Sequence, residues 1–158
     1  MKKLILSLLF SIIFIFQSSF TFAEDIDVTK LTREQIVLLK EKADKGDAEA
    51  QTNLGVLYFN QGKHDLAEKY WKLANEQNFV DAQHHLGVLY YNQGKFDLVE
   101  KYWKMASEQG DKVCQLKLGY VYETQGKYEL AKQYYKAAAD NGSMIGTVLL
   151  NSLIKKGY

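Results

Sequence analysis

The sequence predicts an all-α solenoid, an array of three helical hairpins stacked one on the next. Three near-identical stretches carry this prediction: residues 54–74, 86–106 and 118–138, each starting 32 residues after the one before. Within a stretch, apolar side chains recur at i, i+3 and i+4, the spacing that forms one buried face on an α-helix. A fixed period of this size is typical of repeat arrays, in which each unit packs against its neighbours.

Each stretch encodes two helices joined by a short turn. In the first stretch the apolar stripe breaks at residues 60–63, where Gly62 can take a positive φ and end the first helix. Asp65 falls in the first turn of the second helix, where its charge meets the positive end of the helix dipole. Glu68 and Lys72 make a favourable i,i+4 pair on the exposed side of that helix.

A glycine occupies the middle of each first helix, at Gly55, Gly87 and Gly119. Glycine inside a helix costs about 1 kcal/mol against alanine, so its repetition indicates a packing role. We expect it to allow close approach of the two helices of a hairpin, with Ala67 or Ala131 opposite.

The spacing within these stretches resembles that of the tetratricopeptide repeat. Segment 54–74 carries the Leu-Gly-x-x-Tyr, Ala, aromatic, Ala pattern of that family, and the opening Ala-x-Ala-Gln of segment 48–51 is similar to the related Sel1-like repeat. The resemblance covers residues 32–156 and implies a right-handed α-solenoid. The repeat core expected from these positions is Leu54, Gly55, Tyr58, Ala67, Trp71, Ala74, Leu86, Gly87, Tyr90, Trp103, Ala106, Leu118, Gly119, Tyr122, Ala131, Tyr135 and Ala138.

The period also sets the expected domain organisation. A capping box over Thr32–Gln35 opens a helix that occupies the place of a second repeat helix. The last helix occupies the place of a first one, and we expect its apolar side chains to bury the final hairpin. The expected parts are a loose segment 24–31 and one repeat domain 32–158, made of a capping helix 32–46, repeats 47–78, 79–110 and 111–142, and a capping helix 143–156.

Residues 1–23 have the composition of a bacterial signal peptide. Lys2 and Lys3 precede an apolar run over residues 4–16, and Thr-Phe-Ala ends the segment before Glu24. We therefore expect export through the Sec pathway, to the periplasm or the medium. The alternative is an uncleaved inner-membrane anchor, because residues 4–23 carry no charge over a length that can span a bilayer.

Charge and cysteine content exclude several function classes. The chain has 20 basic and 19 acidic side chains, interspersed along the helices, and this balance offers no stripe for phosphate backbones. We expect no nucleic acid partner, and contact with a membrane only through an uncleaved leader. The single cysteine, Cys114, takes the position held by Ala50 and Ala82, where a buried free thiol is expected.

No metal site, cofactor or catalytic residue is expected. His84 and His85 are adjacent on a helix, so their side chains should diverge by about 100° and not share an ion. Ser152 and Lys155 fit a loose Ser-x-x-Lys pattern without its partner motifs. This pattern leaves open, as a minor alternative, a hydrolase on a Sel1-like scaffold acting on β-lactams or cell wall.

The resemblance implies that the first helices line a concave surface. Aromatic rings there offer flat apolar contact and asparagines can hydrogen-bond a peptide backbone. We call the following residues the groove residues: Thr52, Val56, Phe59, Asn60, His84, Val88, Tyr91, Asn92, Leu116, Tyr120 and Glu123.

The function expected from this reading is a non-catalytic protein–protein interaction scaffold that binds a peptide or a partner helix in the groove. Two alternatives concern the setting and the partner. The chain could meet a host protein as a secreted virulence factor, or it could stack end to end into homo-oligomers.

Overall fold

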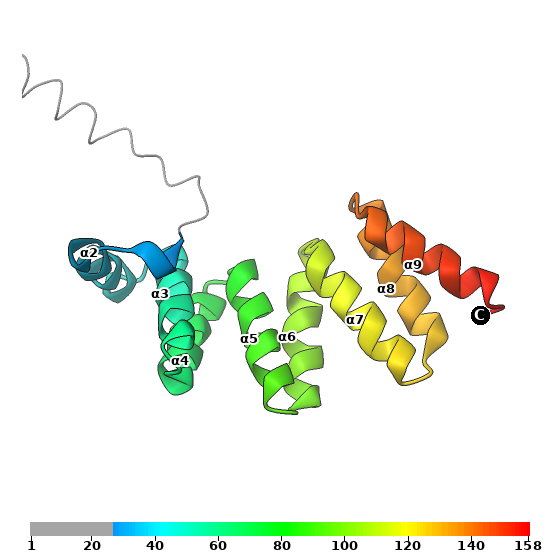
Figure 1. Cartoon of the computed structure of the whole chain (residues 1–158), viewed down its shortest axis with the longest axis horizontal. Helices are drawn as coiled ribbons and strands as arrows, with labels where there is room; N and C mark the ends of the chain where they lie inside the picture. The colour runs from blue at the N-terminus through cyan, green and yellow to red at the C-terminus, as the bar shows by residue number, and fades with distance from the viewer. Residues whose placement is uncertain (1–26) are drawn as a thin grey trace, which may run out of the picture.

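The computed structural model describes residues 27–158, apart from the side chain of Thr29, and the predicted leader lies outside this range. Within it every regular element is a helix, which confirms the predicted all-α solenoid of helical hairpins (Figure 1). The elements are η1 (Val28–Lys30), α2 (Arg33–Asp44), α3 (Ala48–Asn60), α4 (His64–Glu76), α5 (Val80–Asn92), α6 (Phe96–Glu108), α7 (Lys112–Thr124), α8 (Tyr128–Asp140) and α9 (Met144–Lys155).

Each helix packs against its neighbours in the chain. Helix α3 pairs with α4, α5 with α6 and α7 with α8, while α4 meets α5 and α6 meets α7 between hairpins. Figure 1 shows the helices following one another along an arc, with α2 and α9 at opposite ends. Within the described residues the two outer α-helices, α2 and α9, each pack chiefly against one neighbouring helix.

Left-handed residues make the turns. Gly62, Gly94 and Gly126 have φ of +73°, +70° and +72°, as predicted for the turn inside each hairpin. Between α4 and α5 the same role falls to Asn78, with φ of 59°, and asparagine is one of the few non-glycine residues that tolerate this conformation.

Side-chain caps begin several helices. The predicted capping box of α2 is present: Thr32 accepts from the Gln35 backbone N–H, and the Gln35 side chain accepts from the Thr32 N–H. Asp47, Asp111 and Ser143 cap α3, α7 and α9 with the N-cap side chain alone, which accepts from backbone N–H groups two or three residues further on. These caps satisfy backbone donors that a helix start leaves unpaired.

The helix glycines make room for an aromatic ring, which corrects our expectation that alanine lies opposite. A Cβ on Gly55 would collide with the indole of Trp71, and one on Gly87 would collide with that of Trp103. The Trp71 Nε1–H donates to the Thr52 carbonyl at 3.1 Å, so a main-chain hydrogen bond holds the ring over the glycine.

In the third hairpin Tyr135 replaces tryptophan. Its ring covers Gly119, and its hydroxyl donates to Glu123 at 2.8 Å instead of the indole donating to a carbonyl.

The predicted repeat positions form the core, with one exception. Tyr90 and Tyr122 are buried, whereas their equivalent Tyr58 is only half-buried. Tyr90 and Tyr122 each reach a glutamate of the preceding hairpin, but the residue 22 positions before Tyr58 is Ile36. The hydroxyl of Tyr58 therefore lacks the carboxylate that its two equivalents bind.

Two sets of polar side chains join successive hairpins. The Tyr90 hydroxyl donates to Glu68 at 2.8 Å, and Lys72 binds the same carboxylate at 2.6 Å. Tyr122, Glu100 and Lys104 repeat this arrangement one hairpin later. The predicted i,i+4 pair of Glu68 and Lys72 is thus present, an equivalent pair follows one hairpin later, and each pair also anchors a tyrosine of the next hairpin.

Buried glutamines form the second set. Gln51, Gln83 and Gln115 are the fourth residues of α3, α5 and α7, and each is less than 5% exposed. Their side-chain oxygens accept from Gln77, Gln109 and Asn141 respectively, at 2.8–3.0 Å. Burying an amide without a hydrogen-bond partner would cost free energy, and these pairs supply the partners. They also set the register of each joint, by which we mean the contact between one hairpin and the next.

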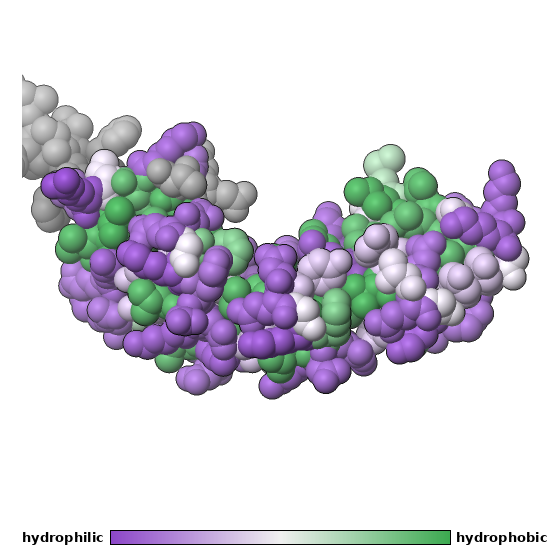
Figure 2. All heavy atoms as spheres, turned by 60° about the horizontal axis from the view of Figure 1, so that its bottom comes forward, coloured by the Kyte–Doolittle hydropathy of each residue, from purple (hydrophilic) through white to green (hydrophobic). Residues whose placement is uncertain are grey.

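Helix α9 packs part of its apolar surface against the core, as expected, and leaves the rest open, which corrects in part our expectation that its apolar side chains bury the last hairpin. Leu153 is 1% exposed, but Met144 is 84% exposed, Val148 66% and Ile145 62%. The reason is the end of the array: α9 takes the place of a first helix, and no second helix follows it in the described chain. Figure 2 shows hydrophobic surface gathered at the C-terminal end of the crescent.

Candidate protein-interaction surface

The groove residues lie on α3, α5 and α7, and their repeated positions share one face of these helices. Phe59 and Tyr91 occupy equivalent positions near the ends of α3 and α5. The Phe59 ring lies 5.7 Å from Trp71 and the Tyr91 ring 5.8 Å from Trp103, measured between ring centroids. The core tryptophans therefore support the inner sides of the Phe59 and Tyr91 rings.

The outer sides of the groove rings are accessible. Tyr91 is 44% exposed and Tyr120 is 58% exposed. Phe59, Val56, Val88 and Leu116 are half-buried, whereas Asn60 and Asn92 at the helix ends are exposed. The surface therefore combines apolar area with amide groups. Figure 2 shows that the array is hollowed along one side.

Two of the groove residues are engaged in the fold. Thr52 is 3% exposed, and its hydroxyl donates to the Ala48 carbonyl at 2.8 Å, so it offers no surface to a partner. This corrects our placing of Thr52 in the groove. Glu123 accepts from Tyr135 and lies 3.6 Å from the Lys156 ammonium, which leaves its carboxylate partly satisfied.

Comparison with known proteins agrees with this architecture. Models of the tetratricopeptide repeat match residues 48–74 and 114–140. The crystal structure of a Sel1 repeat protein from Oxalobacter formigenes is similar, with a TM-score of 0.62 and 30% sequence identity over 77% of this chain and 99% of that one.

The chain belongs to the tetratricopeptide/Sel1-like repeat family. Such repeats generally mediate protein–protein interaction and are generally non-catalytic scaffolds. No curated protein gives a significant match. Among residues 27–158 no helix has the length and apolar character needed to cross a bilayer.

The histidines of this Sel1-like array face different surroundings. His85 stacks on Trp71 at 5.0 Å, and burial together with His84 lowers its pKa to about 4. The rings of His84 and His85 lie nearly parallel, with their centroids 5.6 Å apart. These adjacent side chains therefore do not diverge as we expected from their positions on the helix. Burial lowers the pKa of His84, and Asp111 opposes this effect.

Cys114 is fully buried, as expected for a free thiol at this position, and burial raises its pKa. The sequence analysis did not predict which polar groups lie near this thiol. His84, Asp111 and Cys114 each place one potential metal-ligating atom within 4.8 Å of the others. Sequence inspection missed this cluster because its members belong to two adjacent repeats and lie up to 30 positions apart.

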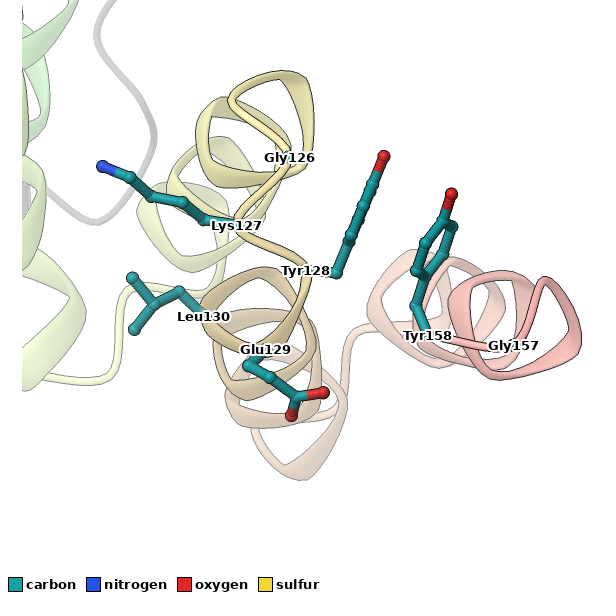
Figure 3. A pocket seen from close by; sticks show the side chains of 7 residues that line it. All are labelled: Gly126, Lys127, Tyr128, Glu129, Leu130, Gly157 and Tyr158. Atoms are coloured by element: carbon teal, nitrogen blue, oxygen red, sulfur yellow. The ribbon is translucent and has the colours of Figure 1, made fainter.

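One pocket lies away from the groove residues. It measures about 440 Å³ and is lined by residues 126–130 together with Gly157 and Tyr158. Figure 3 shows the rings of Tyr128 and Tyr158 lying side by side, and their centroids are 3.6 Å apart. This stacking holds the C-terminal residue Tyr158 against the start of α8. It also leaves no space between the two rings for a planar ligand.

Proposed function

We propose that this repeat protein is an exported, non-catalytic scaffold that holds a peptide segment or a partner helix against α3, α5 and α7. The observation that carries the proposal is the exposure of Tyr91 and Tyr120, two aromatic rings on equivalent faces of successive first helices. Exposed aromatic side chains of this kind are enriched where proteins bind one another.

Preorganisation supports the same proposal. Phe59 and Tyr91 already rest on core tryptophans, so little rotamer freedom would be lost when a partner covers them. Asn60 and Asn92 stand beside these rings and could donate to and accept from an extended backbone.

The test is affinity capture with the full chain carrying a C-terminal tag. Extracts of the native cell envelope and of a host would be used separately, because they distinguish a housekeeping partner from a host partner. The groove variant combines Tyr91→Glu and Tyr120→Glu. The matched control combines Leu66→Glu and Leu130→Glu, which places the same charges at exposed apolar positions of the second helices.

We expect a partner that the wild type and the control retain and the groove variant loses, with all three equally helical by circular dichroism. Capture that is identical for all three would contradict the groove assignment.

The open face of α9 favours a second candidate function, self-association with another copy of the chain. Among residues 27–158, α9 takes the place of the first helix of a hairpin and packs chiefly against α8, and α2 takes the place of a second helix and packs chiefly against α3. The open side of α9 could therefore pair with α2 of another copy, as a first helix pairs with a second one inside each hairpin. Exposed apolar patches of this kind commonly mark interfaces.

The self-association proposal is tested by the mass in solution. Ile145→Glu with Val148→Glu changes exposed residues, whereas Leu153 is buried and would report only on folding. We expect a concentration-dependent mass for the wild type and a monomer for the variant. A wild type that stays monomeric at every concentration would refute the proposal.

A further inference from the structure

The joint between the second and third repeats brings three metal-ligating side chains together. His84 comes from the first half of α5, and Asp111 and Cys114 come from the start of α7. The imidazole nitrogen, a carboxylate oxygen and the sulfur lie within 4.8 Å of one another. Three such donors around one point are the minimum that a catalytic-type zinc site uses, with a fourth position left to water.

The helix cap orients the carboxylate. Asp111 Oδ1 accepts from the backbone N–H groups of Val113 and Cys114 at 2.7 and 2.8 Å. This leaves Oδ2 to face Nδ1 of His84, at 3.9 Å. That distance is too long for a hydrogen bond, so the two groups face each other without bonding directly.

The three donor atoms would need to move only a short distance to bind one ion. Donor atoms bound to one tetrahedral zinc ion lie about 3.3–3.6 Å apart, given bonds of about 2.0 Å to nitrogen and oxygen and 2.3 Å to sulfur. The longest separation that the cluster allows, 4.8 Å, would need to shrink by about 1.5 Å at most, which side-chain rotation can supply. The His84 and Asp111 side chains are 25% and 13% exposed, so an ion can approach from their side.

The donor set fits a borderline transition metal. Thiolate and imidazole favour zinc-type ions over magnesium or calcium, and a carboxylate is a regular third ligand. Asp81 adds negative charge that acts on both His84 and Cys114, whereas Lys117 acts against it. Binding breaks the S–H bond of Cys114: the sulfur keeps the electron pair and donates it to the ion, and the proton leaves to solvent.

The cluster occurs at one joint of the array and not at its equivalents. One repeat earlier the corresponding residues are Thr52, Phe79 and Ala82, and one repeat later they are Leu116, Ser143 and Gly146. The repeat fold does not need these three ligands, because it forms the same joint twice without them.

We propose that His84, Asp111 and Cys114 bind one zinc-type divalent ion, with water as the fourth ligand. The ion ties α5 to α7 and so holds the spacing of two helices that carry groove residues. Because His84 is itself a groove residue, the site lies at the edge of the proposed binding surface.

The equivalent positions supply test variants that the fold already accepts. His84→Thr and Cys114→Ala each place a residue found one or two repeats earlier, and Asp111→Ser keeps a helix-capping hydroxyl like that of Ser143. The control is His64→Phe, which removes an exposed histidine and places the residue found at Phe96. Unfolding temperatures in chelator show whether each variant is folded.

The experiment is a titration of the metal-free full chain with Co²⁺, followed by displacement with Zn²⁺. We expect one equivalent of Co²⁺, a thiolate-to-cobalt charge-transfer band, and a Zn²⁺-dependent rise in the unfolding temperature. Each ligand variant should weaken binding by at least about 100-fold, and the control should bind as the wild type does.

Two results would overturn the proposal. One is a wild type that shows neither the band nor a shift in unfolding temperature. The other is binding that survives unchanged in folded Cys114→Ala or His84→Thr, because the ion would then be held by other surface groups.

Discussion

At Gly87 a hydrogen atom stands where other residues carry a Cβ, and the indole of Trp103 fills the space. The Trp103 Nε1–H donates to the His84 carbonyl at 3.2 Å, so the ring is fixed both by packing and by a main-chain bond. The same pairing recurs at Gly55, and at Gly119 with a tyrosine ring. These glycines are therefore required by an aromatic neighbour and not by their backbone conformation.

Gly87→Ala should lower the free energy of unfolding by about 1–3 kcal/mol, because the added methyl group must displace the Trp103 ring. At a solvent-exposed position in a helix, the same change would raise the free energy of unfolding by about 1 kcal/mol. The sign of the change therefore shows whether the Trp103 ring occupies the space. Urea unfolding measures it. In a Trp103→Leu background the penalty should shrink or reverse, and a penalty of full size there would show that the ring is not its cause.

The sequence predicted which positions form the repeated core, but it did not predict which core side chains contact one another. The periodicity placed Trp71, Trp103 and Tyr135 in the core, and all three are buried. It did not show that each covers a glycine 16 positions earlier, because ring direction depends on the facing helix. The cluster of His84, Asp111 and Cys114 was missed for a similar reason: its residues hold unlike positions in two repeats, and they come together only where the second and third hairpins stack.

Between elements, the joints depend on polar side chains as well as apolar contact. Glu100 of α6 accepts from Tyr122 of α7 and pairs with Lys104. The bonds from Lys104 and Tyr122 lower the pKa of Glu100 below its usual value of 4.5. A carboxylate with a lowered folded-state pKa stabilises the fold above the unfolded-state pKa, and this contribution is lost as the pH falls through the folded-state value.

Glu100→Gln should therefore reduce the free energy of unfolding at pH 7, by less than about 1 kcal/mol because the side chain is partly exposed. The difference from wild type should vanish in acid, below the lowered pKa of Glu100. Urea titrations at pH 7 and at acid pH give the comparison, with Glu129→Gln as a control carboxylate that binds no tyrosine of a following hairpin. A difference of equal size at both pH values would contradict the assigned ion pair.

Helix ends and turns were predictable because their chemistry is local. The capping box at Thr32 and the positive φ of Gly62, Gly94 and Gly126 follow from residue type and position alone. The open face of α9 was not predictable in this way, because burial depends on whether a neighbouring helix exists.

For the whole molecule, the proposed export makes a prediction about its mass. We expect residues 1–23 to be removed, so that the mature chain begins at Glu24. Intact-mass and N-terminal peptide measurements on protein from fractionated cells expressing the full chain would show this. A full-length mass confined to the membrane fraction would instead indicate an uncleaved anchor.

The stacked hairpins form a crescent (Figure 2). Its first helices carry the exposed rings of Tyr91 and Tyr120. The core and polar joints explain why the array folds, and they leave the groove surface free to vary. We propose that partner binding there is the function of the molecule.

Photo-crosslinking in living cells tests this claim most directly. A photoreactive residue would replace Tyr91 or Tyr120 in the full chain, and in matched controls it would replace Leu66 or Leu130 on the second helices. We predict adducts of one defined mass from positions 91 and 120, and none from 66 and 130. Adducts only from the second helices, or equally from all four positions, would contradict the account.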